Sequence, residues 1–151
     1  MLPPPVCVPP TWEAICSIYP SADDFVIRLE QLRWGRKPRC PYCNSLASSR
    51  IKATFRHHCN SCHTSFSVFV RTIMHKTRLD PRKWGLVSIM LLSQHQVPSV
   101  ADIAVILEVN ANTASRIGRC VRSMTGESLG FFEKMHSQIL EDARVKARRP
   151  A

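Results

Sequence analysis

The stretch CPYCNSLASSRIKATFRHHCNSC, residues 40–62, contains two CxxC pairs that are separated by fifteen residues. Each CxxC can form a tight knuckle whose two thiolates meet one ion, and a hairpin of this length brings the knuckles face to face. Four thiolates complete a tetrahedral zinc site and leave no open position. The spacing therefore predicts one structural Zn²⁺ on Cys40, Cys43, Cys59 and Cys62. A ribbon this small buries little apolar surface, so we expect metal binding to be part of its folding.

Three histidines crowd the second knuckle: His57 and His58 precede it and His63 follows it. One of them could replace a cysteine in a Cys₃His set, which leaves an alternative to the four-cysteine site. We expect them instead to be solvated groups that contact phosphate together with the cations of the ribbon. Those cations are Arg50, Lys52 and Arg56.

The charge of the chain is strongly positive and uneven. The net charge is +10 and the pI is about 9.8. From residue 28 to residue 83 thirteen Lys and Arg face two acids, a balance of +11 that exceeds the net charge of the whole chain. Such a segment favours polyanionic partners, nucleic acid first and anionic membrane second, although a merely solvated basic surface is the plain alternative.

The cysteine count and the apolar runs indicate a cytoplasmic protein. The first ten residues hold five prolines and lack the apolar core of a secretory signal. The longest apolar run, near residues 84–92, is too short to span a bilayer. Seven cysteines, four of them in CxxC pairs, fit metal binding in a reducing compartment better than a disulfide framework or redox pairs. We expect Cys7, Cys16 and Cys120 to be buried or incidental thiols.

The pattern of the chain predicts a mainly α protein with a small β zinc ribbon. Ser21 is a good N-cap and Gly35 a good stop for a first helix, and Pro81 stands where a later helix should begin. The apolar residues that follow Pro81 predict a buried helix. The expected segments are a Pro-rich lead (1–20), an N-terminal helix (21–38), the zinc ribbon (39–79), a helix-turn-helix (80–125), and a C-terminal helix with a basic tail (126–151).

Residues 100–121 have the spacing of a helix-turn-helix. Ile103, Leu107 and Ile117 fall at its apolar positions, and Asn110 is placed to cap the second helix. Asn and Arg on the exposed face of that helix suit bidentate contacts to base edges, whereas Ser, Thr and the more distal Arg suit bases or phosphates. Glu108 occupies a turn position that usually holds glycine, so an ordinary helical hairpin stays the alternative. The exposed face carries Asn112, Thr113, Ser115, Arg116 and Arg119.

The order of these parts resembles a known family. LRWGRKPRCPYCNS (32–45) and FRHHCNSCHTSFSVFVRTIMHKTRLDPRKW (55–84), followed by a buried helix and a helix-turn-helix, look like the N-terminal region of bacterial insertion-sequence transposases of the ISXO-like group. The resemblance covers about residues 25–125. One departure is Arg71, which stands where the family usually has glycine. The resemblance implies that the ribbon and the helix-turn-helix bind DNA at transposon ends.

Catalysis in that family belongs to a following RNase H-like domain with a carboxylate triad that binds two divalent metals. Only 27 residues follow Met124, and a catalytic sheet needs on the order of 100 residues. We therefore expect no catalytic residue and no enzyme activity. Residues 128–149 have an amphipathic helical pattern, which we take as the mark of a finished protein and as a surface through which a homodimer could form.

Three functions remain open at this point. The first is a non-catalytic, zinc-containing protein that binds double-stranded DNA in the bacterial cytoplasm, associated with the nucleoid, as a transcriptional regulator or accessory factor. The second is a truncated transposase that binds transposon ends, and the third is an adaptor whose ribbon binds protein or RNA. For DNA binding we add three cations of the segment that follows the ribbon, Arg71, Lys76 and Arg78.

Overall fold

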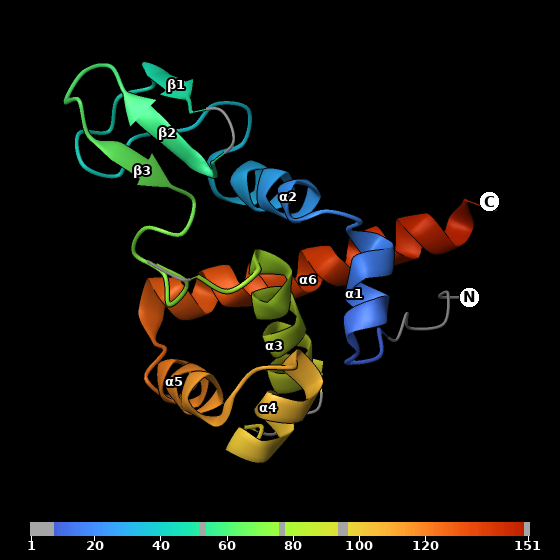
Figure 1. Cartoon of the computed structure of the whole chain (residues 1–151). Coiled ribbons are helices and arrows are strands. Elements are labelled where there is room, and N and C mark those ends of the chain that lie inside the picture. Colours follow the sequence, from blue (N-terminus) through green and yellow to red (C-terminus); the bar gives the residue numbers. More distant parts are fainter. Residues whose placement is uncertain (1–7, 52–53, 76–77, 94–96, 150–151) are drawn as a thin grey trace.

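The computed structural model describes residues 8–51, 54–75, 78–93 and 97–149, which are mostly helical with a small three-stranded sheet at one end (Figure 1). This agrees with the predicted fold class. The helices are α1 (Trp12–Ile18), α2 (Ala22–Trp34), α3 (Pro81–Ser93), α4 (Val100–Leu107), α5 (Ala111–Arg122) and α6 (Gly126–Arg148). The strands are β1 (Ser48–Arg50), β2 (Arg56–Cys59) and β3 (Ser65–Ser67), paired antiparallel in the order β1-β2-β3.

Helix α1 lies within the segment that the sequence suggested was only a Pro-rich lead, so that expectation was wrong for residues 12–18. The Thr11 hydroxyl caps the helix by accepting the N–H of Ala14 at 3.2 Å. Ile15 is fully buried in the core. One buried residue per short helix gives little periodicity, which explains why the pattern of the sequence did not reveal it.

Helix α2 has Ser21 as its N-cap and Gly35 as its C-cap, the two residues that the sequence predicted as its start and stop, and it is shorter than the expected segment 21–38. Ser21 and Asp24 form a reciprocal capping box, in which the Ser21 N–H donates to the Asp24 carboxylate at 3.1 Å and the Asp24 N–H donates to the Ser21 hydroxyl at 3.2 Å. Gly35 ends the helix with a φ of +70°, a conformation that glycine adopts without strain. The helix then leads directly into the ribbon, as Figure 1 shows.

Helix α3 is the centre of the helical core, which confirms that its apolar residues are buried. Residues 84–90 are all buried in it. At Gly85 the helix is so close to its neighbours that a Cβ would lie 3.0 Å from Phe25 of α2 and 3.1 Å from Ile139 of α6. Helices α2, α3 and α6 thus meet at one glycine, which joins the helix that carries the ribbon to the rest of the core.

Helix α6 is longer than its neighbours and begins at Gly126, the first residue of the expected C-terminal helical segment. Its apolar face, with Phe132, Met135 and Ile139, is buried inside the chain and packs against α3. A homodimer through this face is therefore not supported, because the apolar pattern that suggested it is already used within one molecule. No helix in the described ranges combines the length and the apolar character needed to cross a membrane.

Helices α4 and α5 form the predicted helical pair. Ile103, Leu107 and Ile117 are buried between them, and the Asn110 side chain caps α5 by accepting the Thr113 N–H at 2.8 Å. Glu108, at the turn, has the left-handed conformation with φ 56° and ψ 48°. This explains why glycine is usual at such a turn: Glu108 performs the same backbone role at a conformational cost.

Candidate metal centre and nucleic-acid interface

The two CxxC knuckles have the same backbone geometry. In the first, the Asn44 N–H donates to the Cys40 carbonyl at 2.9 Å, and in the second the His63 N–H donates to the Cys59 carbonyl at the same distance. Asn44 and His63 both have positive φ, 67° and 60°. Because each left-handed residue turns the chain back toward its first cysteine, both knuckles direct two sulfurs to one point. His63 is thus the turning residue of a knuckle.

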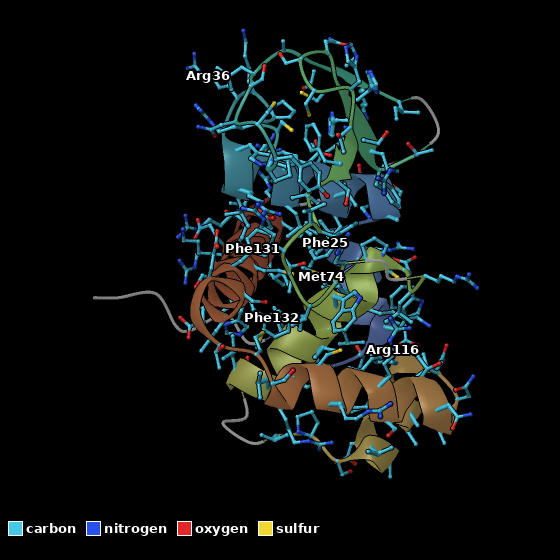
Figure 2. The ribbon with its side chains drawn as sticks, turned by 90° about the vertical axis from the view of Figure 1, so that its left-hand side faces the viewer. Phe25, Arg36, Met74, Arg116, Phe131 and Phe132 are labelled. Carbon is cyan, nitrogen blue, oxygen red and sulfur yellow. The ribbon has the colours of Figure 1, made fainter. Side chains whose placement is uncertain are left out.

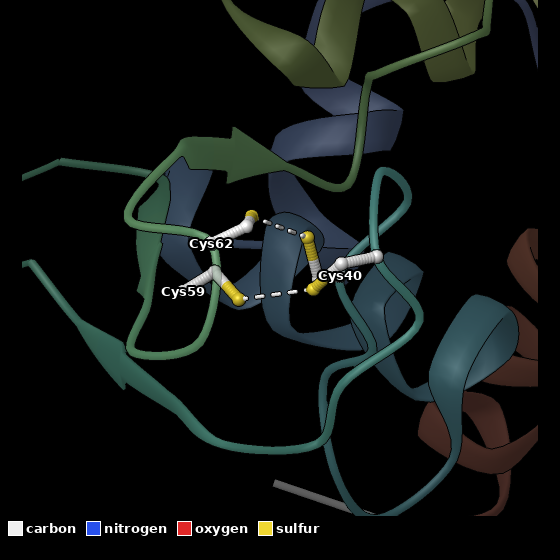
Figure 3. Close-up of side chains that lie close together, drawn as sticks. Cys40, Cys59 and Cys62 are labelled. Carbon is white, nitrogen blue, oxygen red and sulfur yellow. Dashed lines mark hydrogen bonds between the residues drawn. The ribbon is translucent and has the colours of Figure 1, made fainter.

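The four cysteine sulfurs lie together in the arrangement that a tetrahedral metal needs. All four Sγ atoms are within 4.8 Å of one another. The distance from Cys40 to Cys62 is 3.7 Å and that from Cys43 to Cys59 is 3.5 Å, and Figure 3 shows both contacts bridging the two knuckles. A tetrahedral Zn²⁺ with Zn–S bonds of about 2.3 Å holds its sulfurs about 3.8 Å apart. The residues present fit one zinc ion.

The second knuckle also favours the thiolate, which is the form of cysteine that binds metal. Hydrogen bonds from the Thr64 side chain and backbone lower the pKa of Cys62 to about 6. The backbone N–H of Cys62 in turn lowers the pKa of Cys59. Within the described residues no histidine joins this metal-binding group, so the four-cysteine set is favoured over the Cys₃His alternative.

His57 is a structural residue of the ribbon, which corrects the expectation that it contacts phosphate. Its side chain is only 4% exposed, and its Nε2 lies 3.1 Å from a carboxylate oxygen of Glu30 on α2. Its ring stacks on Phe66 and meets the edge of Trp34, with ring centroids 5.5 and 5.7 Å apart. A group enclosed in this way cannot reach a ligand in solvent.

These contacts join the ribbon to α2. The small core of the ribbon consists of Cys40, Cys59, Phe66 and Val70, with Trp34 of α2 packed against it. Two of those four buried residues are metal-binding cysteines, so the ribbon has little apolar core apart from its knuckles. The helix and the ribbon therefore form one structural unit.

Of the other ribbon residues predicted to contact DNA, Arg50 and Arg56 already have partners within the chain. Arg50 is 41% exposed and pairs with Glu30 at 3.3 Å, and Arg56 donates to the Ser65 carbonyl at 3.2 Å. Lys52 and Lys76 lie outside the described residues. Sequence reasoning missed Arg36 and Lys37, which are exposed just before the first knuckle and have no hydrogen bond or ion pair with any described residue. Their position between Gly35 and Pro38 indicates a loop, and this was the signal in the sequence that they are exposed.

The predicted contacts outside the ribbon are accessible. Arg71, Arg78, Arg116 and Arg119 are exposed, with no hydrogen bond or ion pair to the part of the chain that the structure describes. Arg71, where the resemblance led us to expect glycine, has a positive φ of 64°. Of the other α5 residues, Asn112 is exposed, whereas Thr113 and Ser115 are half-buried.

The candidate contacts lie in two separate parts of the molecule. Arg36 is at the ribbon end and Arg116 is on α5, with Phe25, Met74, Phe131 and Phe132 between them (Figure 2). The structure therefore does not bring the ribbon cations and the α5 residues into one site. They form two cationic surfaces on a common core.

Comparison with known proteins identifies one of these parts. Residues 21–65 match the family model of the transposase zinc-ribbon domain. The matched segment contains α2, both knuckles and β1–β2, which is the unit joined by His57, Glu30 and Trp34. No curated protein and no solved structure matches the chain. Residues 21–65 are a zinc ribbon of the transposase type.

Proposed function

We propose that this chain binds double-stranded DNA, with one structural Zn²⁺ on the four cysteines, and that it acts as a regulator or accessory factor without cleaving DNA. The observation that carries the proposal is the joining of a transposase-type ribbon to a helical pair whose second helix exposes Asn112, Arg116 and Arg119. Both parts present cations without intramolecular partners among the described residues, and such cations are available to phosphates.

The proposed role of zinc is structural. Four thiolates close the coordination sphere of the ion, so the metal orders the backbone and takes no part in a reaction. The cationic loop with Arg36 and Lys37 enters the first knuckle directly. In this proposal the metal fixes the first knuckle and so holds the loop where it contacts DNA. Helix α2 packs against both the ribbon and the helical core and so fixes the position of one relative to the other.

The experiment is an anisotropy titration of the zinc-loaded protein with labelled random duplex DNA at several salt concentrations. We expect log K to fall linearly with log[salt], with a slope of about −0.9 for each phosphate contacted. Arg36→Ala and Lys37→Ala should each reduce the magnitude of that slope by about 1, by the same relation. Lys146→Ala is the matched control, because the Lys146 ammonium on α6 already donates to the Ser17 hydroxyl on α1 at 3.1 Å.

Two outcomes would overturn the proposal. A wild-type protein that fails to bind duplex DNA at low salt would favour an adaptor for protein or RNA. Nicking of supercoiled plasmid in the presence of Mg²⁺, retained at constant specific activity through purification, would contradict the non-catalytic role.

A further inference from the structure

A groove lies beside the first half of α5, away from the zinc ribbon. Its volume is about 650 Å³, and it separates α5 from the segment that leads into α3. Its walls include the apolar residues Ile73, Trp84 and Ile117. Two arginines also line it, Arg78 from the segment before α3 and Arg116 from α5. The groove therefore combines an apolar lining with cations from two distant parts of the sequence.

The charges around the groove favour an anion. Arg78 and Arg116 are exposed and lack a hydrogen bond or ion pair to any residue that the structure describes. By contrast, the nearby Arg82 is held by Asp80 at 2.9 Å and by backbone carbonyls. Glu108 is the one carboxylate among the residues that line the groove, and His75 lies in the same lining. Two permanently charged guanidinium groups thus outweigh one acid.

The groove also divides the predicted DNA-contacting residues of α5 into two sets. Thr113 and Arg116 line it, whereas Asn112, Ser115 and Arg119 do not. A helix that lies in the major groove of DNA presents its central face to base edges and its flanks to the sugar–phosphate backbone. The Arg116 side is thus the flank that faces the segment containing Arg78.

We propose that this groove holds a backbone phosphate of duplex DNA between Arg78 and Arg116. This inference rests on the DNA binding proposed above and gives Arg116 a different role from the one that the sequence suggested: it contacts the backbone, and base discrimination falls to the other side of α5. The apolar walls suit the aliphatic stems of the two arginines and the deoxyribose next to the phosphate.

The test compares Arg78→Ala, Arg116→Ala and the double variant, each titrated with a panel of duplexes of different sequence at several salt concentrations. Each single variant should weaken binding to every duplex by the same factor. Because the two arginines share one phosphate, the single and double variants alike should lower the magnitude of the salt slope by no more than about 1. Because both side chains hold one phosphate, the double variant should lose less affinity than the product of the two single losses. Arg78→Lys and Arg116→Lys, which keep the charge, should retain the wild-type slope.

Asn112→Ala is the matched control on the other side of the helix, and it should change the order of affinities within the panel. If Arg116→Ala changes that order, or if Arg78→Ala binds as the wild type does, the phosphate assignment is wrong although DNA binding stands. If the wild-type protein binds no duplex, the proposed function fails with it. The three results are distinguishable in one set of titrations.

Discussion

Replacing His57 by glutamine tests whether this histidine is structural. The change removes the ring that stacks on Phe66 and meets Trp34, and it disturbs the contact to Glu30, whose side chain is only 13% exposed. A buried polar group that loses its partner costs about 1–3 kcal/mol, and each lost aromatic contact adds about 0.5–1.5 kcal/mol. We expect a loss of about 2–4 kcal/mol if glutamine recovers part of the hydrogen bonding.

The assay is thermal unfolding of the zinc-loaded protein, combined with the salt dependence of DNA binding. A domain of this size shifts its Tm by about 2–4 °C per kcal/mol, so His57→Gln should lower Tm by about 4–16 °C. His58→Gln is the matched control, because His58 is adjacent on β2 and half-exposed; it should leave Tm within about 2 °C of the wild type, as surface substitutions do. A His57→Gln protein that melts like the wild type but has a reduced salt slope would show that His57 contacts phosphate and is not a structural residue.

Three further perturbations test other parts of the structure. In urea unfolding, Gly85→Ala should be less stable than the control Gly130→Ala by about 1–3 kcal/mol. A Cβ at Gly85 would lie 3.0 Å from Phe25 and overpack the core, whereas a Cβ at Gly130 meets nothing within 4 Å. Equal stabilities would contradict the close approach of α3 to α2. Glu108→Gly should stabilise the protein by about 1 kcal/mol by removing left-handed strain, and a destabilised variant would argue against the observed turn. Chelation of zinc should collapse the amide spectrum of residues 39–70 and spare that of α3 and α6, since the ribbon core is separate and small; an unchanged ribbon spectrum would refute a structural metal.

Local chemistry made much of this fold predictable. Ser21 and Asn110 cap their helices as expected, because a side-chain oxygen at the N-cap accepts a hydrogen bond from a free N–H group of the first helical turn. The CxxC spacing predicted the cluster of sulfurs because each knuckle is a local structure. The helical pair also followed from its apolar spacing, although its DNA-binding role remains a prediction.

The features that were not predicted depend on which face a residue presents. His57 was assigned to the surface because the four cysteines complete the metal site without it and because it lies beside the cations of the ribbon. Strand alternation contained the missing signal: Cys59 must face the metal, and residues two apart on a strand share a face, so His57 faces inward with it. The apolar face of α6 was correctly identified, but only the packing against α3 reveals that it is covered within the chain.

X-ray absorption at the zinc edge of the purified protein tests the metal centre most directly. We expect one zinc per chain, surrounded by four sulfur atoms at about 2.3 Å and no nitrogen. A first shell of three sulfurs and one nitrogen would contradict the four-cysteine assignment, and a protein that folds fully without zinc would contradict the structural role of the metal.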